Sequence, residues 1–183
     1  MYHILKQIIA TGIRTEPAPQ IDVALRATHA RLRADILQYF GGALTIRHVD
    51  AGSCNGCELE INALNNPYYN LDGLGIKFVA SPRHADMLLV TGPVSRHMEV
   101  ALRRTYDATP EPKLVVALGD CGCTGGIFGE SYASLGRVSN VIPVDVAVPG
   151  CPPTPFAIMQ GILTALDSRA ASSAQINGGE THE

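Results

Sequence analysis

Three glycine-rich stretches carry all five cysteines of the chain, and thiols are the side chains here with the most chemistry to offer. The stretches are GSCNGCELE from Gly52, GDCGCTGG from Gly119 and VPGCPPTP from Val148. Their cysteines are Cys54, Cys57, Cys121, Cys123 and Cys151. Such thiols could bind a metal ion or an iron-sulfur cluster, form a redox-active pair, or be small buried side chains without chemistry.

Each of these stretches comes after an aliphatic run that predicts a buried strand. Strands are predicted over residues 44–49, 76–80, 87–91, 114–118 and 144–148, and helices over residues 58–66, 95–106 and 154–168. Alternating helices and strands with continuous apolar runs predict an α/β, flavodoxin-like doubly wound fold, in which helices cover both faces of a parallel sheet. The carboxyl ends of parallel strands meet at one edge, so we expect the thiols to converge there.

The chain divides into three predicted parts. They are an N-terminal helical arm at residues 1–43, the flavodoxin-like domain at 44–170 and a disordered tail at 171–183. The arm begins with a short helix that is expected to stop near Gly12, Pro17 and Pro19. Its apolar residues share one face: Ile4, Leu5, Ile8 and Ile9. A second helix is predicted over residues 22–40, before the Gly41-Gly42 pair.

Length and composition exclude several classes of protein. A chain of 183 residues suits one domain with a sizeable core. Five unevenly spaced cysteines do not make a secreted disulfide scaffold, so a reducing compartment is expected. The sequence shows no secretory signal and no run of eighteen apolar residues. It is therefore expected neither to be exported nor to span a membrane by itself.

Charge is distributed unevenly along the chain. Residues 1–48 hold six basic and three acidic side chains, a net charge of +3, whereas the remaining residues hold eight basic and fourteen acidic ones, a net of −6. Nucleic acid is a poor candidate partner, because the basic residues are few and no aromatic residues are interleaved with them. The basic leader is interpreted either as a solvated surface or as an arm that docks on a partner or a membrane surface.

The spacing of the cysteines bears on what they could bind. Structural zinc usually takes two close cysteine pairs, whereas here one C-x₂-C pair is joined by cysteines from two distant stretches. That pattern favours an iron-sulfur cluster over one zinc ion. The glycines around the cysteines would let the backbone approach an inorganic core. Zinc, a redox dithiol and inert thiols remain as alternatives.

Four motifs, in this order, resemble the small-subunit family shared by nickel-iron hydrogenases and the 20 kDa, NuoB-type subunit of NADH:quinone oxidoreductase. They are GSCNGCE, SPRHADMLLVTGPVS, ALGDCGCTGGIFG and VPGCPPTP, within about residues 44–168. The resemblance implies a flavodoxin-like domain that binds one [4Fe-4S] cluster next to a catalytic large subunit. The ligands that it implies are Cys54, Cys57, Cys121 and Cys151. Cys121 is favoured over Cys123, because the family's ligand comes two residues after the strand-end glycine.

The resemblance also indicates a branch of the family. The quinone-reducing branch typically has two adjacent cysteines where this chain has Cys54 and Cys57 three positions apart, as hydrogenases do. Periplasmic uptake hydrogenase subunits are longer, with a twin-arginine leader and further clusters. The sequence is thus most similar to the short subunits of membrane-bound, energy-converting hydrogenases of the formate hydrogenlyase and hydrogenase-4 type.

The leading hypothesis is therefore an electron-transfer subunit of a membrane-bound [NiFe] hydrogenase complex, peripheral on the cytoplasmic side of the inner membrane. The partners implied are a catalytic large [NiFe] subunit, a ferredoxin-like two-cluster subunit and integral membrane subunits. One alternative is a NuoB-like cluster subunit of a respiratory NADH:quinone-type oxidoreductase. Another is a zinc-stabilised or flavin-binding flavodoxin-like interaction module; flavin is disfavoured, because the cysteine pair occupies the turn where a phosphate loop would lie.

Other residues near the motifs have an ordinary interpretation beside a functional one. Glu58 and Glu60 are acids at a helix N-terminus, which the helix dipole favours, and Glu58 could also serve proton movement or pairing at an interface. Arg83 and His84 could tune a cluster, but solvated or interface positions are favoured, and His97 is interpreted as a surface residue. The Thr91-Gly92-Pro93 turn ends a strand at the edge where the cysteines are expected, so contact with them is plausible.

Overall fold

A computed structural model of the protein describes residues 2–12 and 22–177. Within these ranges, five parallel strands form one sheet in the order β2-β1-β3-β4-β5. The strands are β1 (Leu44–Asp50), β2 (Ile76–Phe78), β3 (Met87–Thr91), β4 (Leu114–Leu118) and β5 (Val146–Val148). This is the flavodoxin strand order, and it confirms the fold class predicted from the sequence.

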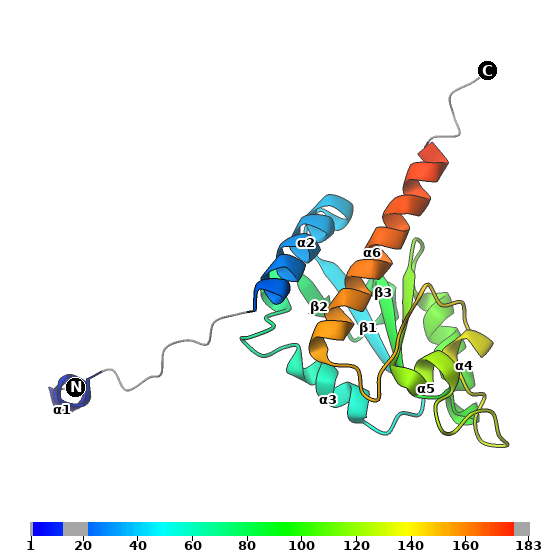
Figure 1. The fold of residues 1–183 in the computed structure, drawn as a ribbon, viewed down its shortest axis with the longest axis horizontal. Helices are drawn as coiled ribbons and strands as arrows, with labels where there is room; N and C mark the ends of the chain where they lie inside the picture. The colour runs from blue at the N-terminus through cyan, green and yellow to red at the C-terminus, as the bar shows by residue number, and fades with distance from the viewer. Residues whose placement is uncertain (1, 13–21, 178–183) are drawn as a thin grey trace.

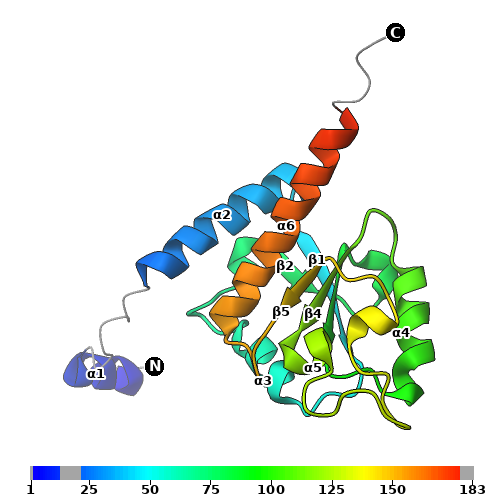
Figure 2. The ribbon, with the colours of Figure 1, turned by 45° about the vertical axis from the view of Figure 1, so that its right-hand side comes forward.

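Helices cover both faces of the sheet. The helices in the described ranges are α1 (Tyr2–Thr11), α2 (Val23–Phe40), α3 (Gly56–Ala63), α4 (Arg96–Ala108), α5 (Gly119–Thr124) and α6 (Pro155–Asn177), with 3₁₀ turns η1 (Asp72–Leu74), η2 (Pro82–His84) and η3 (Val138–Asn140). Figure 1 and Figure 2 show α2 and α6 side by side over one face and α4 on the other. Among the described helices, none combines the length and apolar character that a membrane span requires.

The side chains of the strands alternate between two buried clusters, as a period of two requires. Leu44 and Ile46 of β1 face the cluster under α2 and α6, which includes Leu32 and Ile158. Residues of the opposite parity, such as Val90 of β3, face the second cluster, under α4. β3 and β4 are buried along their whole length, so the core fixes the centre of the sheet.

Some element bounds differ from the prediction. α3 runs from Gly56 to Ala63 rather than over 58–66, and the short α5, which carries Cys121 and Cys123, was not predicted at all. β5 begins at Val146 rather than at residue 144. The reason lies in Asp145, whose side-chain Oδ2 accepts a hydrogen bond from Val115 N at 2.7 Å, where a strand would offer a backbone carbonyl.

The two ends of the chain also differ in part from the prediction. α1 is present and all its residues are exposed, but Pro17 and Pro19 lie outside the described residues. α6 is longer than predicted and continues to Asn177, so residues 171–177 of the predicted disordered tail are helical. Residues 178–183 lie outside the described ranges.

Candidate functional site

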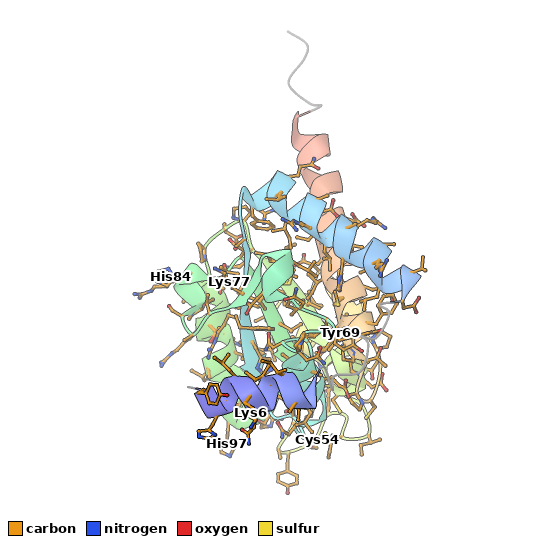
Figure 3. All side chains as sticks on the ribbon, turned by 90° about the vertical axis from the view of Figure 1, so that its left-hand side faces the viewer. Lys6, Cys54, Tyr69, Lys77, His84 and His97 are labelled. Carbon is orange, nitrogen blue, oxygen red and sulfur yellow. The ribbon has the colours of Figure 1, made fainter. Side chains whose placement is uncertain are left out.

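Four of the five cysteines line one cavity at the carboxyl ends of the strands. Cys54 lies between β1 and α3, Cys57 in the first turn of α3, Cys121 in α5, and Cys151 after β5. The cavity has a volume of about 160 Å³, and its other lining residues are Ser53, Gly56, Gly92, Asp120, Gly150 and Pro152. β1, β3, β4 and β5 are successive neighbours in the sheet, so their following loops meet there. Figure 3 shows Cys54 at the end of the molecule opposite the C-terminal end of α6.

The four thiols differ in exposure. Cys57 and Cys121 are partly buried, whereas Cys54 and Cys151 are exposed. Burial raises the pKa of Cys57 to about 12, and the neighbouring Glu58 and the other three thiols add to that rise. Burial and the proximity of Cys151, Cys54 and Asp120 also raise the pKa of Cys121. The thiols are therefore near enough to affect one another's ionisation, and a cationic core would favour their thiolate forms.

Two glycines leave room beside the sulfur atoms. A Cβ added at Gly119, whose φ is +80°, would lie 2.7 Å from Cys57 Sγ. A Cβ added at Gly126, whose φ is +55°, would lie 2.8 Å from Cys121 Sγ. Any larger residue would combine a strained backbone with a clash at a thiol, so glycine is needed at both positions.

Two aspartates that sequence reasoning missed order the cysteine loops. Asp50 Oδ1 accepts hydrogen bonds from Gly52 N at 2.8 Å and from Ser53 N at 2.7 Å, which folds the turn that leads to Cys54. Asp120 Oδ1 accepts a hydrogen bond from Gly150 N at 2.8 Å, and Asp120 N donates to Gly150 O at 2.8 Å. An aspartate two residues before a glycine, at a strand end, was the available signal for Asp50, because such side chains cap turns. No sequence signal identified the partner of Asp120.

Cys123 lies outside the cavity lining. Its Sγ donates a weak hydrogen bond to Ala117 O at 3.5 Å, and burial raises its pKa to about 11. Its thiol therefore points back toward β4, while Cys121, two residues earlier, lines the cavity.

The remaining residues singled out in the sequence fall into two groups. Arg83, His84 and His97 are exposed and do not line the cavity, and Figure 3 shows His84 projecting outward. Glu58 and Thr91 lie together beside it, because Thr91 Oγ1 donates a hydrogen bond to Glu58 Oε1. Glu60 is half-buried on α3, away from the cavity lining.

The donor set fits an iron-sulfur cluster. In the ranges that the structure describes, no three His, Cys, Asp or Glu side chains are grouped so that they could hold a metal ion. The four thiols are instead distributed around a cavity, as the ligands of a multi-iron core would be, with glycine backbone close to the sulfur atoms.

The family model described as the 20 kDa subunit of NADH:ubiquinone oxidoreductase matches residues 54–165. The chain belongs to this family. The resemblance predicted from the sequence motifs is thus confirmed, and the matched region begins at Cys54 and includes all five cysteines of this 20 kDa-type subunit.

Individual relatives of the 20 kDa-type subunit come from several complexes. It is 45% identical over 137 residues to a probable membrane-bound hydrogenase subunit, mbhJ, of Pyrococcus furiosus, covering 75% of this chain and 82% of that one. It is 44% identical over 137 residues to formate hydrogenlyase subunit 7 of Escherichia coli, covering 75% of this chain and 54% of the relative. A chain in the structure of the archaeal membrane-bound sulfane sulfur reductase matches with a TM-score of 0.60 and 32% identity, over 85% of this chain and 77% of that chain.

These relationships show that the chain is an oxidoreductase subunit. The family to which it belongs binds an iron-sulfur cluster. The thiols that line the cavity supply the donors that such a group needs.

Proposed function

We propose that the chain is the electron-transfer subunit of a membrane-bound, cytoplasm-facing [NiFe] hydrogenase complex. In this proposal Cys54, Cys57, Cys121 and Cys151 hold one [4Fe-4S] cluster next to the catalytic large subunit. The single observation that carries it is the meeting of these four thiols, from three distant loops, around one cavity at the carboxyl edge of the sheet. When bound, the cluster supplies a site that accepts and releases electrons.

The chain's own residues hold that site and leave one side of it accessible. Cys57 and Cys121 are partly buried against the sheet, while Cys54, Cys151 and Pro152 are exposed at the surface. A partner that docks on the exposed side would cover the cavity and exclude water from it. The exposed Leu59, Ile127 and Phe128 offer apolar surface on α3 and on the loop after α5 for such a contact.

The choice of complex is supported by the relatives and by the cysteine spacing. Relatives named as a membrane-bound hydrogenase subunit and a formate hydrogenlyase subunit share 45% and 44% identity with the chain. The C-x₂-C spacing of Cys54 and Cys57 is that of hydrogenases. The free thiols suit a reducing compartment, and hence the cytoplasmic side of the membrane. In this proposal the other partners are a ferredoxin-like two-cluster subunit and integral membrane subunits.

The N-terminal arm is proposed to bind the chain to its membrane partners or to the membrane surface. The apolar residues of α1 are exposed, with 61% of the surface of Ile4 and 82% of that of Ile9 accessible, so no other described residue covers the apolar face of the helix. Removal of residues 2–12 should release the chain from the membrane fraction and leave its iron content unchanged.

The test is anaerobic purification of the native complex, with analysis of iron, acid-labile sulfide and nickel and an assay of hydrogen evolution. About four iron and four sulfide per cluster are expected for this subunit, with nickel in the large subunit. Cys151→Ala should abolish electron flow and the cluster's EPR signal. Cys123→Ala, the matched control, should leave both largely intact, because Cys123 is outside the cavity lining. The reverse result would reassign the fourth ligand.

A NuoB-like subunit of a respiratory oxidoreductase is the second candidate. The family description and the 32% identity to a chain of the sulfane sulfur reductase complex favour it, since neither names a hydrogenase. A complex with iron but no nickel and no hydrogen evolution would select this candidate. Zinc without iron would instead select a zinc-stabilised interaction module.

A further inference from the structure

Glu58 is a nearly buried acid beside the cysteine turn, and the proposed function gives it no role. It follows Cys57 in the first turn of α3, and its side chain is only 12% exposed. Its Oε1 accepts a hydrogen bond from Thr91 Oγ1 and lies 3.4 Å from His48 Nε2. Its Oε2 is buried and has no hydrogen-bond partner among the described residues. A carboxylate in such a place is costly unless something offsets it.

The contacts of Glu58 hold its carboxylate close to the cavity. Thr91 is fully buried at the end of β3 and adjoins Gly92, which lines the cavity. His48 Nε2 lies 3.1 Å from Thr91 Oγ1. Since Thr91 has a single hydroxyl proton and donates it to Glu58, its oxygen can accept a hydrogen from His48 Nε2. The ends of β1 and β3 thus fix the position of the carboxylate.

At neutral pH, His48 does not neutralise this carboxylate. Burial lowers the pKa of His48 from 6.5, and this effect outweighs the opposite pull of Glu58, so the imidazole is neutral at pH 7. Among the ion pairs of the described residues, His48 is the only partner of Glu58. The negative charge of Glu58 is therefore poorly screened by solvent and without a cationic partner.

That charge lies beside the cysteines. Glu58 directly follows Cys57 in α3, and its carboxylate is hydrogen-bonded to Thr91, which adjoins the cavity-lining Gly92. Asp120, which lines the cavity, is also acidic, but its Oδ1 accepts a hydrogen bond from Gly150 N. A negative charge at this place disfavours adding an electron to a group bound by Cys57, because reduction adds negative charge close to it.

We propose that Glu58 lowers the reduction potential of the cluster held by Cys54, Cys57, Cys121 and Cys151. The inference rests on the proposed function, since it requires the cluster to be bound there. Glu58 is therefore not a ligand but a residue that tunes the reduction potential of the cluster. Thr91 and His48 keep its carboxylate in place.

The test is a redox titration of the anaerobically purified native complex, followed by EPR at a fixed pH of 7. Glu58→Gln and Glu58→Met both remove the charge, and both should raise the midpoint potential. We expect at least a ten-fold change in the equilibrium constant for one-electron reduction, which corresponds to about 59 mV. Glu58→Asp keeps the charge and should stay close to the native potential. Glu60→Gln, two residues further along the same helix and away from the cavity lining, is the matched control and should not shift it.

The outcomes separate the inference from the proposed function. Native EPR intensity with an unchanged midpoint in the two neutral variants would overturn the inference and leave the cluster in place. An equal shift in Glu60→Gln would overturn it as well. If both neutral variants lose the cluster and Glu58→Asp retains it, the carboxylate has a structural role only, and the inference fails. A native complex without iron or an EPR signal would instead refute the proposed function.

Discussion

Asp120 connects two cysteine loops that are thirty positions apart in the chain. Its Oδ1 accepts a hydrogen bond from Gly150 N at 2.8 Å, next to Cys151, while its own backbone carries the chain into Cys121. The second bond of this pair, from Asp120 N to Gly150 O, involves only backbone atoms. The side-chain bond is therefore the part of the connection that a substitution can remove.

Asp120→Ala should reduce the iron bound per chain, because the Cys151 loop is then held by one bond instead of two. The partly buried Gly150 N–H would lose its acceptor, at a cost of about 1–3 kcal/mol. Asp120→Asn keeps an oxygen acceptor at the same place and should retain native iron content. Iron and sulfide analysis after anaerobic purification checks both variants. Equal loss in both would mean that the charge, and not the hydrogen bond, is what matters.

At the residue scale, the sequence predicted which side chains carry chemistry better than which ones support them. The cysteine stretches could be recognised because strand ends, glycines and thiol spacing are local features. Asp120 could not be recognised as the partner of Gly150, since that contact depends on how two loops meet in space. The same holds for Glu58, whose first interpretation as a helix N-terminal acid omits its contact with Thr91, thirty-three positions away.

At the scale of elements, the packing of α6 on β5 determines where the Cys151 loop begins. A Cβ added at Gly161 of α6 would clash with Val148 Cγ2 at the end of β5. Val148 is buried and lies three residues before Cys151. The absence of a side chain at Gly161 thus lets the helix lie close against the strand that carries a predicted ligand.

Gly161→Ala should lower the free energy of unfolding by about 1–2 kcal/mol. Overpacking of a core costs about 1–3 kcal/mol, and the better helix propensity of alanine offsets up to about 1 kcal/mol of this. In a Val148→Ala background, Gly161→Ala should lower the free energy of unfolding much less, because the smaller residue at position 148 makes room for the new methyl group. Denaturant unfolding of the single and double variants measures this coupling. Strictly additive effects would contradict the proposed contact.

The same elements show where prediction from the pattern is reliable. β3 and β4 were predicted with their observed bounds, because a run of four or five consecutive apolar residues has one suitable place, the centre of a parallel sheet. β5 was predicted two residues too long at its start, since Asp145 bonds to β4 through its side chain. α5 was missed, because a six-residue helix rich in glycine and cysteine has no apolar period to detect.

At the scale of the whole molecule, the core and the cysteine edge are separate parts. The two buried clusters are made of apolar side chains, mainly from the strands and from α2, α3, α4 and α6, with others from the 3₁₀ turns and loops. Among the four cavity-lining cysteines, Cys57 alone packs against the first cluster, and Cys54 and Cys151 are exposed. The cysteines therefore contribute little to the apolar burial that stabilises the fold.

Removal of iron should consequently leave the fold intact and loosen only the cysteine edge. This differs from small zinc domains, where metal binding and folding are one process.

Raised pKa values at Cys57 and Cys121 mean that their free thiols are protonated at neutral pH, so metal-free loops would not repel one another through charge. Hydrogen exchange, compared before and after anaerobic chelation of iron, should show lost protection near residues 52–57, 119–126 and 150–154. The segment of α4, Arg96–Ala108, serves as the internal control, because it packs on the opposite cluster and should exchange at the same rate in both forms. Lost protection in β3 and β4 would contradict this, since it would mean that the cluster, and not the apolar core, holds the sheet together.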